Sequence, residues 1–181
     1  MKEFLEQYKL DAVLVHTPAN MRNISGFTGE GLVYASKEDA WILTDSRYTI
    51  AAAEESRGFE VLEYKKNIQQ YLVEKIVKKH PELAEKTFRI GFEDAVMTVE
   101  TYRTLEALFE KMNLKQWELV PLHKKLDKMR QIKTPEEIES IKKAEKIGDE
   151  AFTKVTDWLT KCYREKTSVT EKQVAAHIEF Y

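Results

Sequence analysis

Four histidines and one cysteine are the side chains of this sequence best suited to bind a metal or to attack a substrate: His16, His80, His123, His177 and Cys162. None of the histidines belongs to a His-x-x-x-His arrangement, and none has a carboxylate at zinc-ligand spacing. A nucleophilic cysteine needs a base within reach, and no base can be assigned to Cys162. The sequence therefore predicts no catalytic constellation and no metal ligands.

His16 is the strongest candidate among the histidines because it follows an apolar run, Ala12–Val15. A continuous apolar run of this length is typical of a strand that is buried on both faces. Ligands collect at strand ends in open α/β sheets, so His16 would lie where a ligand binds. A hydrogen-bonded structural histidine is the alternative at such a position, and the sequence alone favours it.

A charged and aromatic cluster, Asp45, Arg47 and Tyr48, follows a second apolar run, Trp41–Leu43. Alternate residues of a strand point to the same face, so we expect Asp45 to pair with Arg47 and Tyr48 to point to the other face. The pair predicts either a buried salt bridge that fixes the edge of the sheet or a contact surface for a substrate or partner. Both interpretations stay open at this point.

A glycine-rich loop, Gly26–Gly31, has neither dinucleotide-binding nor Walker spacing. The loop leads from a short helix into a strand, whereas phosphate-binding loops lead from a strand into a helix. The side chain of Glu30 would also repel a phosphate. The pattern predicts a structural or lid-like loop.

The elements that would position these residues alternate between strands and helices. We expect a hairpin turn at Ser36–Asp39, and Pro18 is suited to begin a short helix. Further strands are predicted at 12–15, 32–35, 41–43, 59–64, 88–92 and 117–120, and helices at 2–9, 49–57, 67–79 and 98–112. This alternation is typical of a layered α/β domain.

The pattern changes after residue 123. A basic run, 124–133, precedes two helix starts of the capping-box type, Thr134–Glu137 and Thr170–Gln173. An apolar stripe from Ile138 to Trp158 predicts a long amphipathic helix, and the last helix carries no C-cap signal, as expected of a truncated domain. We therefore predict a domain at 1–123, a linker at 124–134 and helices of a second domain at 135–181.

The overall composition excludes several classes of protein. The chain of 181 residues is 43% hydrophobic, which is sufficient for a real core, and its net charge of -2 gives no general attraction to nucleic acid or anionic membranes. No apolar run is long enough to span a bilayer, and the N-terminus has no signal-peptide pattern. A single cysteine excludes an internal disulfide framework, so we expect a cytoplasmic setting.

Seven segments of the sequence resemble, in the same order, segments of the creatinase/prolidase family, which contains Xaa-Pro aminopeptidases and Xaa-Pro dipeptidases. The segments similar to the family's N-terminal domain are Leu10–Ala12, Pro18–Asn20, Ser25–Gly29 and Thr44–Tyr48. Those similar to the entry into its catalytic domain are Met129–Ile138, Ala144–Phe152 and Thr170–Ala176. Together they extend over nearly the whole chain.

This resemblance implies an N-terminal α/β domain with a mixed β-sheet flanked by helices, followed by the first helices of a truncated pita-bread domain. In the family, that second domain binds two divalent metal ions, often manganese or cobalt, through two Asp, one His and two Glu. All five ligands lie beyond the segments found here. We therefore expect no cofactor in this chain and no activity from the chain alone.

The resemblance also implies a function for the longer parent, namely a metal-dependent Xaa-Pro exopeptidase of aminopeptidase P or prolidase type that acts on proline-containing peptides. In the family, the N-terminal domain supports dimerisation and covers a neighbouring active site, and the candidates for such contacts are Phe27, Arg47 and Tyr48. The alternatives are a non-catalytic binding module of the same fold and a creatinase-type amidinohydrolase.

Overall fold

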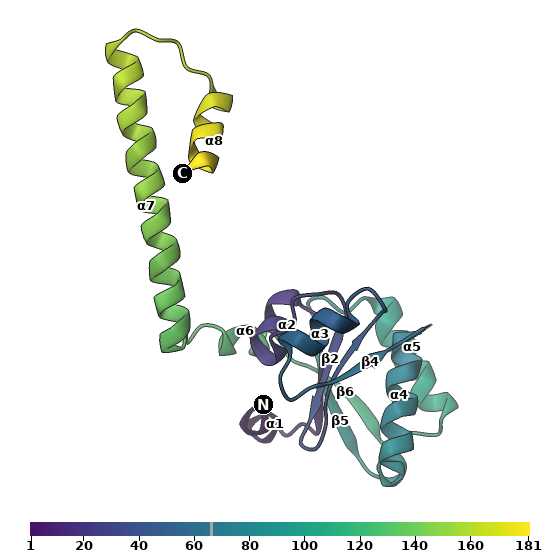
Figure 1. The fold of residues 1–181 in the computed structure, drawn as a ribbon. Helices are drawn as coiled ribbons and strands as arrows, with labels where there is room; N and C mark the ends of the chain where they lie inside the picture. Colours follow the sequence, from purple (N-terminus) through teal and green to yellow (C-terminus); the bar gives the residue numbers. More distant parts are fainter. Residues whose placement is uncertain (66) are drawn as a thin grey trace. The chain divides into compact units, whose positions relative to one another are not determined.

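A computed structural model describes residues 1–65 and 67–181 and divides the chain into two compact units, Met1–Gln131 and Ile132–Tyr181 (Figure 1). We call them the sheet domain and the helical unit and describe each by itself. The predicted linker, 124–134, includes a one-turn helix, α6 (Lys125–Met129), whose Leu126 is buried. The boundaries at 123 and 134 stay predictions.

The sheet domain is built on one mixed sheet with the strand order β4-β3-β2-β1-β5-β6. The strands are β1 (Ala12–Val15), β2 (Leu32–Ser36), β3 (Ala40–Thr44), β4 (Glu60–Glu63), β5 (Phe88–Phe92) and β6 (Trp117–Pro121). β2 is antiparallel to both of its neighbours, and every other pair is parallel. Five strands therefore run in one direction, which confirms the predicted α/β fold with a mixed sheet.

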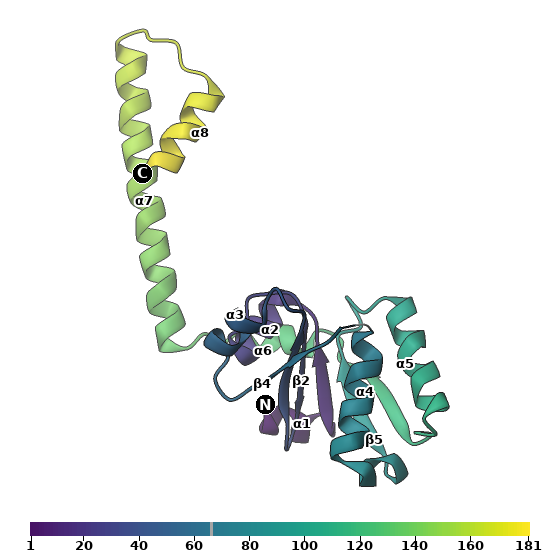
Figure 2. The same ribbon diagram turned by 45° about the vertical axis from the view of Figure 1, so that its right-hand side comes forward.

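Helices cover both faces of this sheet (Figure 2). One face packs against α4 (Ile68–Lys79) and α5 (Val99–Lys111), and the 3-10 helix η1 (Pro81–Glu85) follows α4. The other face packs against α1 (Lys2–Gln7), α2 (Pro18–Ser25), α3 (Thr49–Glu55) and α6. This arrangement makes a three-layer sandwich around two hydrophobic clusters.

The central strand β1 explains why the sequence forms these layers. Ala12 and Leu14 point into the cluster beneath α4 and α5, whereas Val13 and Val15 point into the cluster on the other face. All four residues are buried, as the continuous apolar run predicts. Each large aliphatic side chain buried in this way contributes about 1.5–3 kcal/mol.

The hairpin predicted at Ser36–Asp39 is confirmed, because β2 and β3 pair in antiparallel register on either side of it. The Ser36 hydroxyl accepts hydrogen bonds from the backbone N–H groups of Glu38 and Asp39 at 3.2 and 2.9 Å. Within the hairpin, the rings of Tyr34 and Trp41 stack with their centroids 4.8 Å apart. The turn and the aromatic pair together fix the strand register.

The helical unit consists of α7 (Pro135–Arg164) and α8 (Glu171–Phe180). Both predicted capping boxes are present, with Thr134 capping α7 and Thr170 capping α8. The helix α8 packs against the second half of α7, where the ring of Trp158 stacks on His177 with centroids 3.8 Å apart.

Every residue in the first half of α7 is exposed. Three isoleucines of its apolar stripe are exposed there: Ile138 (43%), Ile141 (45%) and Ile147 (61%). Among the described residues, no helix is long and apolar enough to cross a membrane.

Candidate functional site

Five strands of the sheet end at the same edge, which we call the carboxyl edge. It holds the segments that follow β1, β3, β4, β5 and β6, together with the glycine-rich loop that leads into the antiparallel β2. The predicted candidates His16, Phe27, Arg47 and Tyr48 all lie there, although they come from three separate segments. Ligands of open α/β sheets bind at such an edge.

Phe27, Tyr48 and Arg47 form a column of contacts. The rings of Phe27 and Tyr48 meet edge to face with centroids 6.4 Å apart, and the Arg47 guanidinium carbon lies 5.1 Å from the centre of the Tyr48 ring. Phe27 is fully buried, Tyr48 is half-buried and Arg47 is exposed. The column therefore presents Arg47 and Tyr48 at the surface and Phe27 as the support beneath them.

The predicted pairing of Asp45 with Arg47 is confirmed, with an Nη2–Oδ2 distance of 2.7 Å. Glu30 of the glycine loop adds a second ion pair at 3.0 Å. The hydrogen bonds from Arg47 lower the pKa of the Asp45 carboxyl. The carboxylates of Asp45 and Glu30 in turn raise the pKa of the Arg47 guanidinium. The Arg47 side chain is 64% exposed, so the interpretation as a buried salt bridge is wrong.

The expected direction of Tyr48 is also wrong. Strand β3 ends at Thr44, and the chain then turns into α3 at Thr49, so the alternation of a strand no longer applies at Tyr48. The turn places the Tyr48 ring on the same side as Arg47, where the two make a cation–π contact.

The glycine-rich loop is tied to the rest of this site at both of its ends. Gly26 has a φ of 85° and ends α2 in the left-handed conformation that glycine adopts without strain. The backbone N–H of Thr28 donates to a carboxylate oxygen of Glu55 on α3 at 2.8 Å. Gly31 lies against the carbonyl oxygen of Leu43, which leaves no room for a Cβ atom.

Glu93 is a residue of this site that no sequence motif indicates. Its buried carboxylate accepts hydrogen bonds from the backbone N–H groups of His16 and Thr17 at 2.6 and 2.8 Å. It also accepts one from the side-chain amide of Asn20 at 2.6 Å. The available signal was its position directly after β5, where polar side chains point to the carboxyl edge.

The imidazole of His16 sits in the surroundings that Glu93 organises. Its Nδ1 atom is buried and has no hydrogen-bond partner among the described residues. Burial lowers the pKa of His16, and the charge of Glu93 offsets this in part. His16 is therefore suited to remain neutral rather than to act as a cation.

Asn20 extends this cluster to α6. Its side-chain amide donates to Asp127 at 3.0 Å, and its carbonyl oxygen accepts from Nε of Arg130 at 2.6 Å. A cavity of about 200 Å³ lies beside these residues. Its lining includes the side chains of Thr17, Asp94, Lys124, Leu126, Asp127 and Arg130. The cavity thus has charges of both signs on its wall.

Acid is expected to destabilise the sheet domain through Asp94 and Asp127. The hydrogen bond from the His123 backbone lowers the pKa of Asp94, and those from Asn20 and Arg130 lower the pKa of Asp127. Because both pKa values are lower in the folded state, their stabilisation is present above the ordinary value of 3.8 and is lost as the pH falls below it.

Urea unfolding at about pH 6 and about pH 3 measures this effect. Asp127→Asn and Asp94→Asn should each reduce the loss of stability between the two pH values. Glu110→Gln, on the exposed face of α5, is the matched control and should leave the loss unchanged. If the parent and both aspartate variants lose the same free energy of unfolding between the two pH values, the assignment of the acid sensitivity to Asp94 and Asp127 is wrong.

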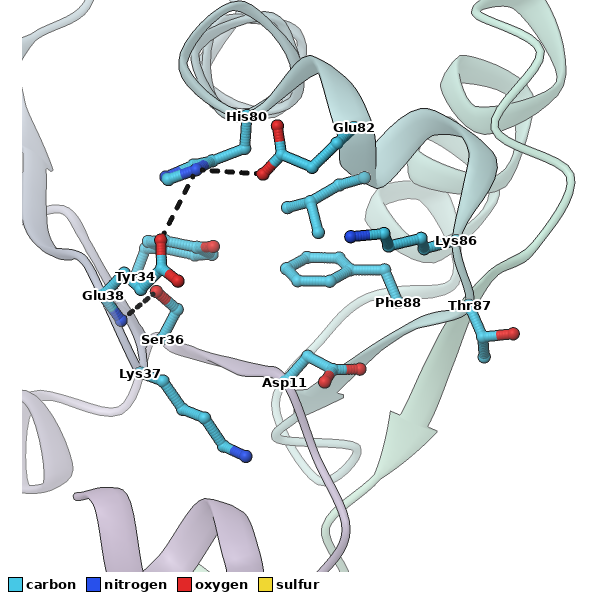
Figure 3. Close-up of a pocket in the computed structure, with 11 residues that line it drawn as sticks. Asp11, Tyr34, Ser36, Lys37, Glu38, His80, Glu82, Lys86, Thr87 and Phe88 are labelled. Carbon is cyan, nitrogen blue, oxygen red and sulfur yellow. Dashed lines mark hydrogen bonds and ion pairs between the residues drawn. The ribbon is translucent and has the colours of Figure 1, made fainter.

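The opposite edge of the sheet contains a second ionic cluster, at a cavity of about 190 Å³ (Figure 3). Buried Asp39 accepts from Lys79 and contacts Nε2 of His80 at 2.6 Å. Glu38 and Glu82 each approach Nδ1 of His80 at 3.6 Å. These contacts join the hairpin turn to the end of α4, so we assign His80 a structural role.

A pair of divalent metal ions does not fit the described residues. No group of three or more His, Cys, Asp or Glu side chains that could hold a metal ion occurs in the part of the chain that the structure describes. His123 pairs with Asp94 at 3.1 Å, while His177 and Cys162 lie in the helical unit. No catalytic step can therefore be assigned to a metal held by these residues.

Curated proteins similar to this chain include two peptidases. The peptidase YqhT of Bacillus subtilis is 31% identical over 185 residues, which cover 100% of this chain and 47% of that protein. The Xaa-Pro dipeptidase of Pyrococcus furiosus is 28% identical over 184 residues, which cover 98% of this chain and 45% of that protein. The chain thus spans about half the length of these relatives.

A solved structure and a family profile agree with this similarity. The X-Pro aminopeptidase of Thermotoga maritima has a TM-score of 0.73 and 26% identity, covering 97% of this chain and 47% of that one. The profile of the creatinase/prolidase N-terminal domain matches residues 1–132. The resemblance noted in the sequence is therefore confirmed, and the chain belongs to the creatinase/prolidase N-terminal domain family.

Proposed function

We propose that this chain is the N-terminal part of a metal-dependent Xaa-Pro exopeptidase, of aminopeptidase P or prolidase type. In this proposal the sheet domain supports a homodimer and covers an active site, and the helical unit supplies the first helices of the catalytic domain. The relatives named above support the substrate class, because two of them are Xaa-Pro peptidases by name.

The observation that carries the proposal is the distribution of exposed apolar side chains on the sheet domain. Among the residues of the sheet domain that the structure describes, four large ones are exposed: Ile50 (74%), Val96 (48%), Val99 (68%) and Met129 (37%). Each of them lies on a segment that follows the carboxyl end of β3, β5 or β6. Exposed apolar side chains along one edge of the sheet are suited to contact with another surface.

The Arg47–Tyr48 column lies at the same edge and adds a cation and an aromatic ring to this surface. Arginine and tyrosine are enriched at binding interfaces because they combine charge or hydrogen bonding with a large apolar area. We propose that Arg47 and Tyr48 contact the substrate or the second protomer. Phe27, being buried, would act by holding the Tyr48 ring in place.

The helical unit has a surface that supports its proposed role as the first helices of the catalytic domain. The exposed isoleucines in the first half of α7 form an apolar surface that a catalytic domain would cover. Two manganese or cobalt ions would be held by that domain rather than by the residues described here. The lone, buried Cys162 is compatible with a reducing cytoplasm, which we propose as the location.

The reading frame beyond the codon for Tyr181 tests this proposal. The expected result is a continuation that supplies two Asp, one His and two Glu as metal ligands. The encoded protein should then cleave Xaa-Pro peptides with manganese and lose this activity with a chelator. The 181-residue chain, assayed beside it, should neither cleave them nor bind manganese with micromolar affinity in calorimetry.

The outcomes separate the alternatives. A continuation without the five ligands would identify a non-catalytic binding module. Hydrolysis of creatine rather than of Xaa-Pro peptides would identify an amidinohydrolase. Micromolar manganese binding by the 181-residue chain would contradict the absence of a metal site in it.

A further inference from the structure

The turn that precedes α6 has a strained backbone. His123 and Lys124 have φ values of 47° and 60°, so two consecutive residues other than glycine are left-handed. This conformation places Cβ too close to the following carbonyl oxygen and is disfavoured for both residues. Strain of this kind persists only where surrounding contacts hold it.

Asp94 holds the strained turn directly. Its Oδ1 accepts from the backbone N–H of His123 at 2.7 Å, and its Oδ2 contacts Nδ1 of the same residue at 3.1 Å. Two further residues on either side of the turn, Leu122 and Leu126, are buried at 1% and 2% exposure. The turn is therefore fixed by one carboxylate and by two apolar anchors.

Asn20 holds the helix that follows the turn. Its side chain is 2% exposed and makes hydrogen bonds to Glu93, Asp127 and Arg130 at 2.6, 3.0 and 2.6 Å. Arg130 also pairs with Asp127 at 3.0 Å, which closes a ring of three side chains. A single buried amide thus connects α6 to Glu93 after β5, and Glu93 in turn accepts from the backbone that follows β1.

We propose that residues 123–130 form a latched connector, in which Asp94 and Asn20 hold the strained His123–Lys124 turn closed. The closed latch holds α6 against the core of the sheet domain. When the hydrogen bonds of Asp94 and Asn20 break, the segment opens as one unit, because release of the strained turn also frees α6. Opening of residues 123–130 then leaves the pairing of β1 with β5 intact, since that pairing joins Ala12–Leu14 to Ile90–Phe92 and does not include the opened segment.

Hydrogen exchange measured by mass spectrometry on the 181-residue chain tests the latch. Asn20→Leu and Asp94→Ala should each accelerate amide exchange in residues 123–130 at least tenfold while leaving β1 and α4 unchanged. Glu118→Gln, an exposed carboxylate on β6, is the matched control and should change neither region. Asp94→Ala keeps the test valid if Asn20→Leu does not fold.

The strained turn is tested separately at Lys124. Lys124→Val should accelerate exchange in 123–130, because a β-branched side chain disfavours positive φ, whereas Lys124→Gly should not. Unchanged exchange in 123–130 for Asp94→Ala would overturn the proposal. So would equal acceleration in β1 and α4, which would indicate global destabilisation, or identical behaviour of the two Lys124 variants.

Discussion

Trp41→Ala is expected to lower the free energy of unfolding of the sheet domain by about 3–5 kcal/mol. The Trp41 side chain is 1% exposed, and its ring stacks on Tyr34 with centroids 4.8 Å apart. The ammonium groups of Lys75 and Lys79 lie over the same ring at 5.8 and 5.4 Å. The substitution would leave a cavity between β3 and α4 and remove both cation–π contacts.

Urea denaturation followed by circular dichroism measures this loss, with Trp158→Ala as the matched control. Trp158 lies in the helical unit, where its ring stacks on His177. Its removal should leave the unfolding of the sheet domain unchanged within about 0.5 kcal/mol. If both variants cost the sheet domain the same free energy, the assignment of Trp41 to its core is wrong.

Gly31→Ala is expected to destabilise the sheet domain by about 2–3 kcal/mol. A Cβ atom at this position would clash with the carbonyl oxygen of Leu43 and would also crowd Thr44. The clashing atom belongs to the backbone of β3, so no side-chain rotation can relieve the contact. Either the start of β2 or the end of β3 must move.

Gly148→Ala provides a control with the opposite sign. Gly148 lies inside α7, and a Cβ atom there would meet nothing within 4 Å. Alanine has the higher helix propensity, so the variant should stabilise the helical unit by about 1 kcal/mol. Thermal melts at 222 nm would measure both changes. A Gly31→Ala variant as stable as the parent would contradict the close approach of β2 and β3.

The sequence predicts those parts of the fold whose signals are local. The buried run Ala12–Val15, the turn at Ser36–Asp39 and the capping box at Thr134 each contain their own physical reason within a few residues. The prediction for Tyr48 fails because it assumes that side chains alternate along a strand, and strand β3 has already ended at Thr44. Alternation predicts side-chain direction only while the chain remains extended.

The candidate site was less predictable because its contacts are long-range. Glu93 is separated from Asn20 by 73 residues in the sequence, and Asn20 from Arg130 by 110. No pattern within a segment indicates that these three side chains meet. For Gly26 and Gly31 the sequence predicts only that the backbone is free to turn. The structure shows that Gly31 is required for a different reason, namely the close approach of β3.

The order of the strands also limits how two copies of this chain can associate. The outermost strands are β4 and β6, which display backbone groups that could pair with a strand of another molecule. β4 is only four residues long and has exposed glutamates at both ends, and β6 ends in Pro121, which has no N–H to donate. Both strands therefore oppose edge-to-edge pairing and fibril growth. A dimer of this chain should consequently form through side chains rather than by extension of the sheet.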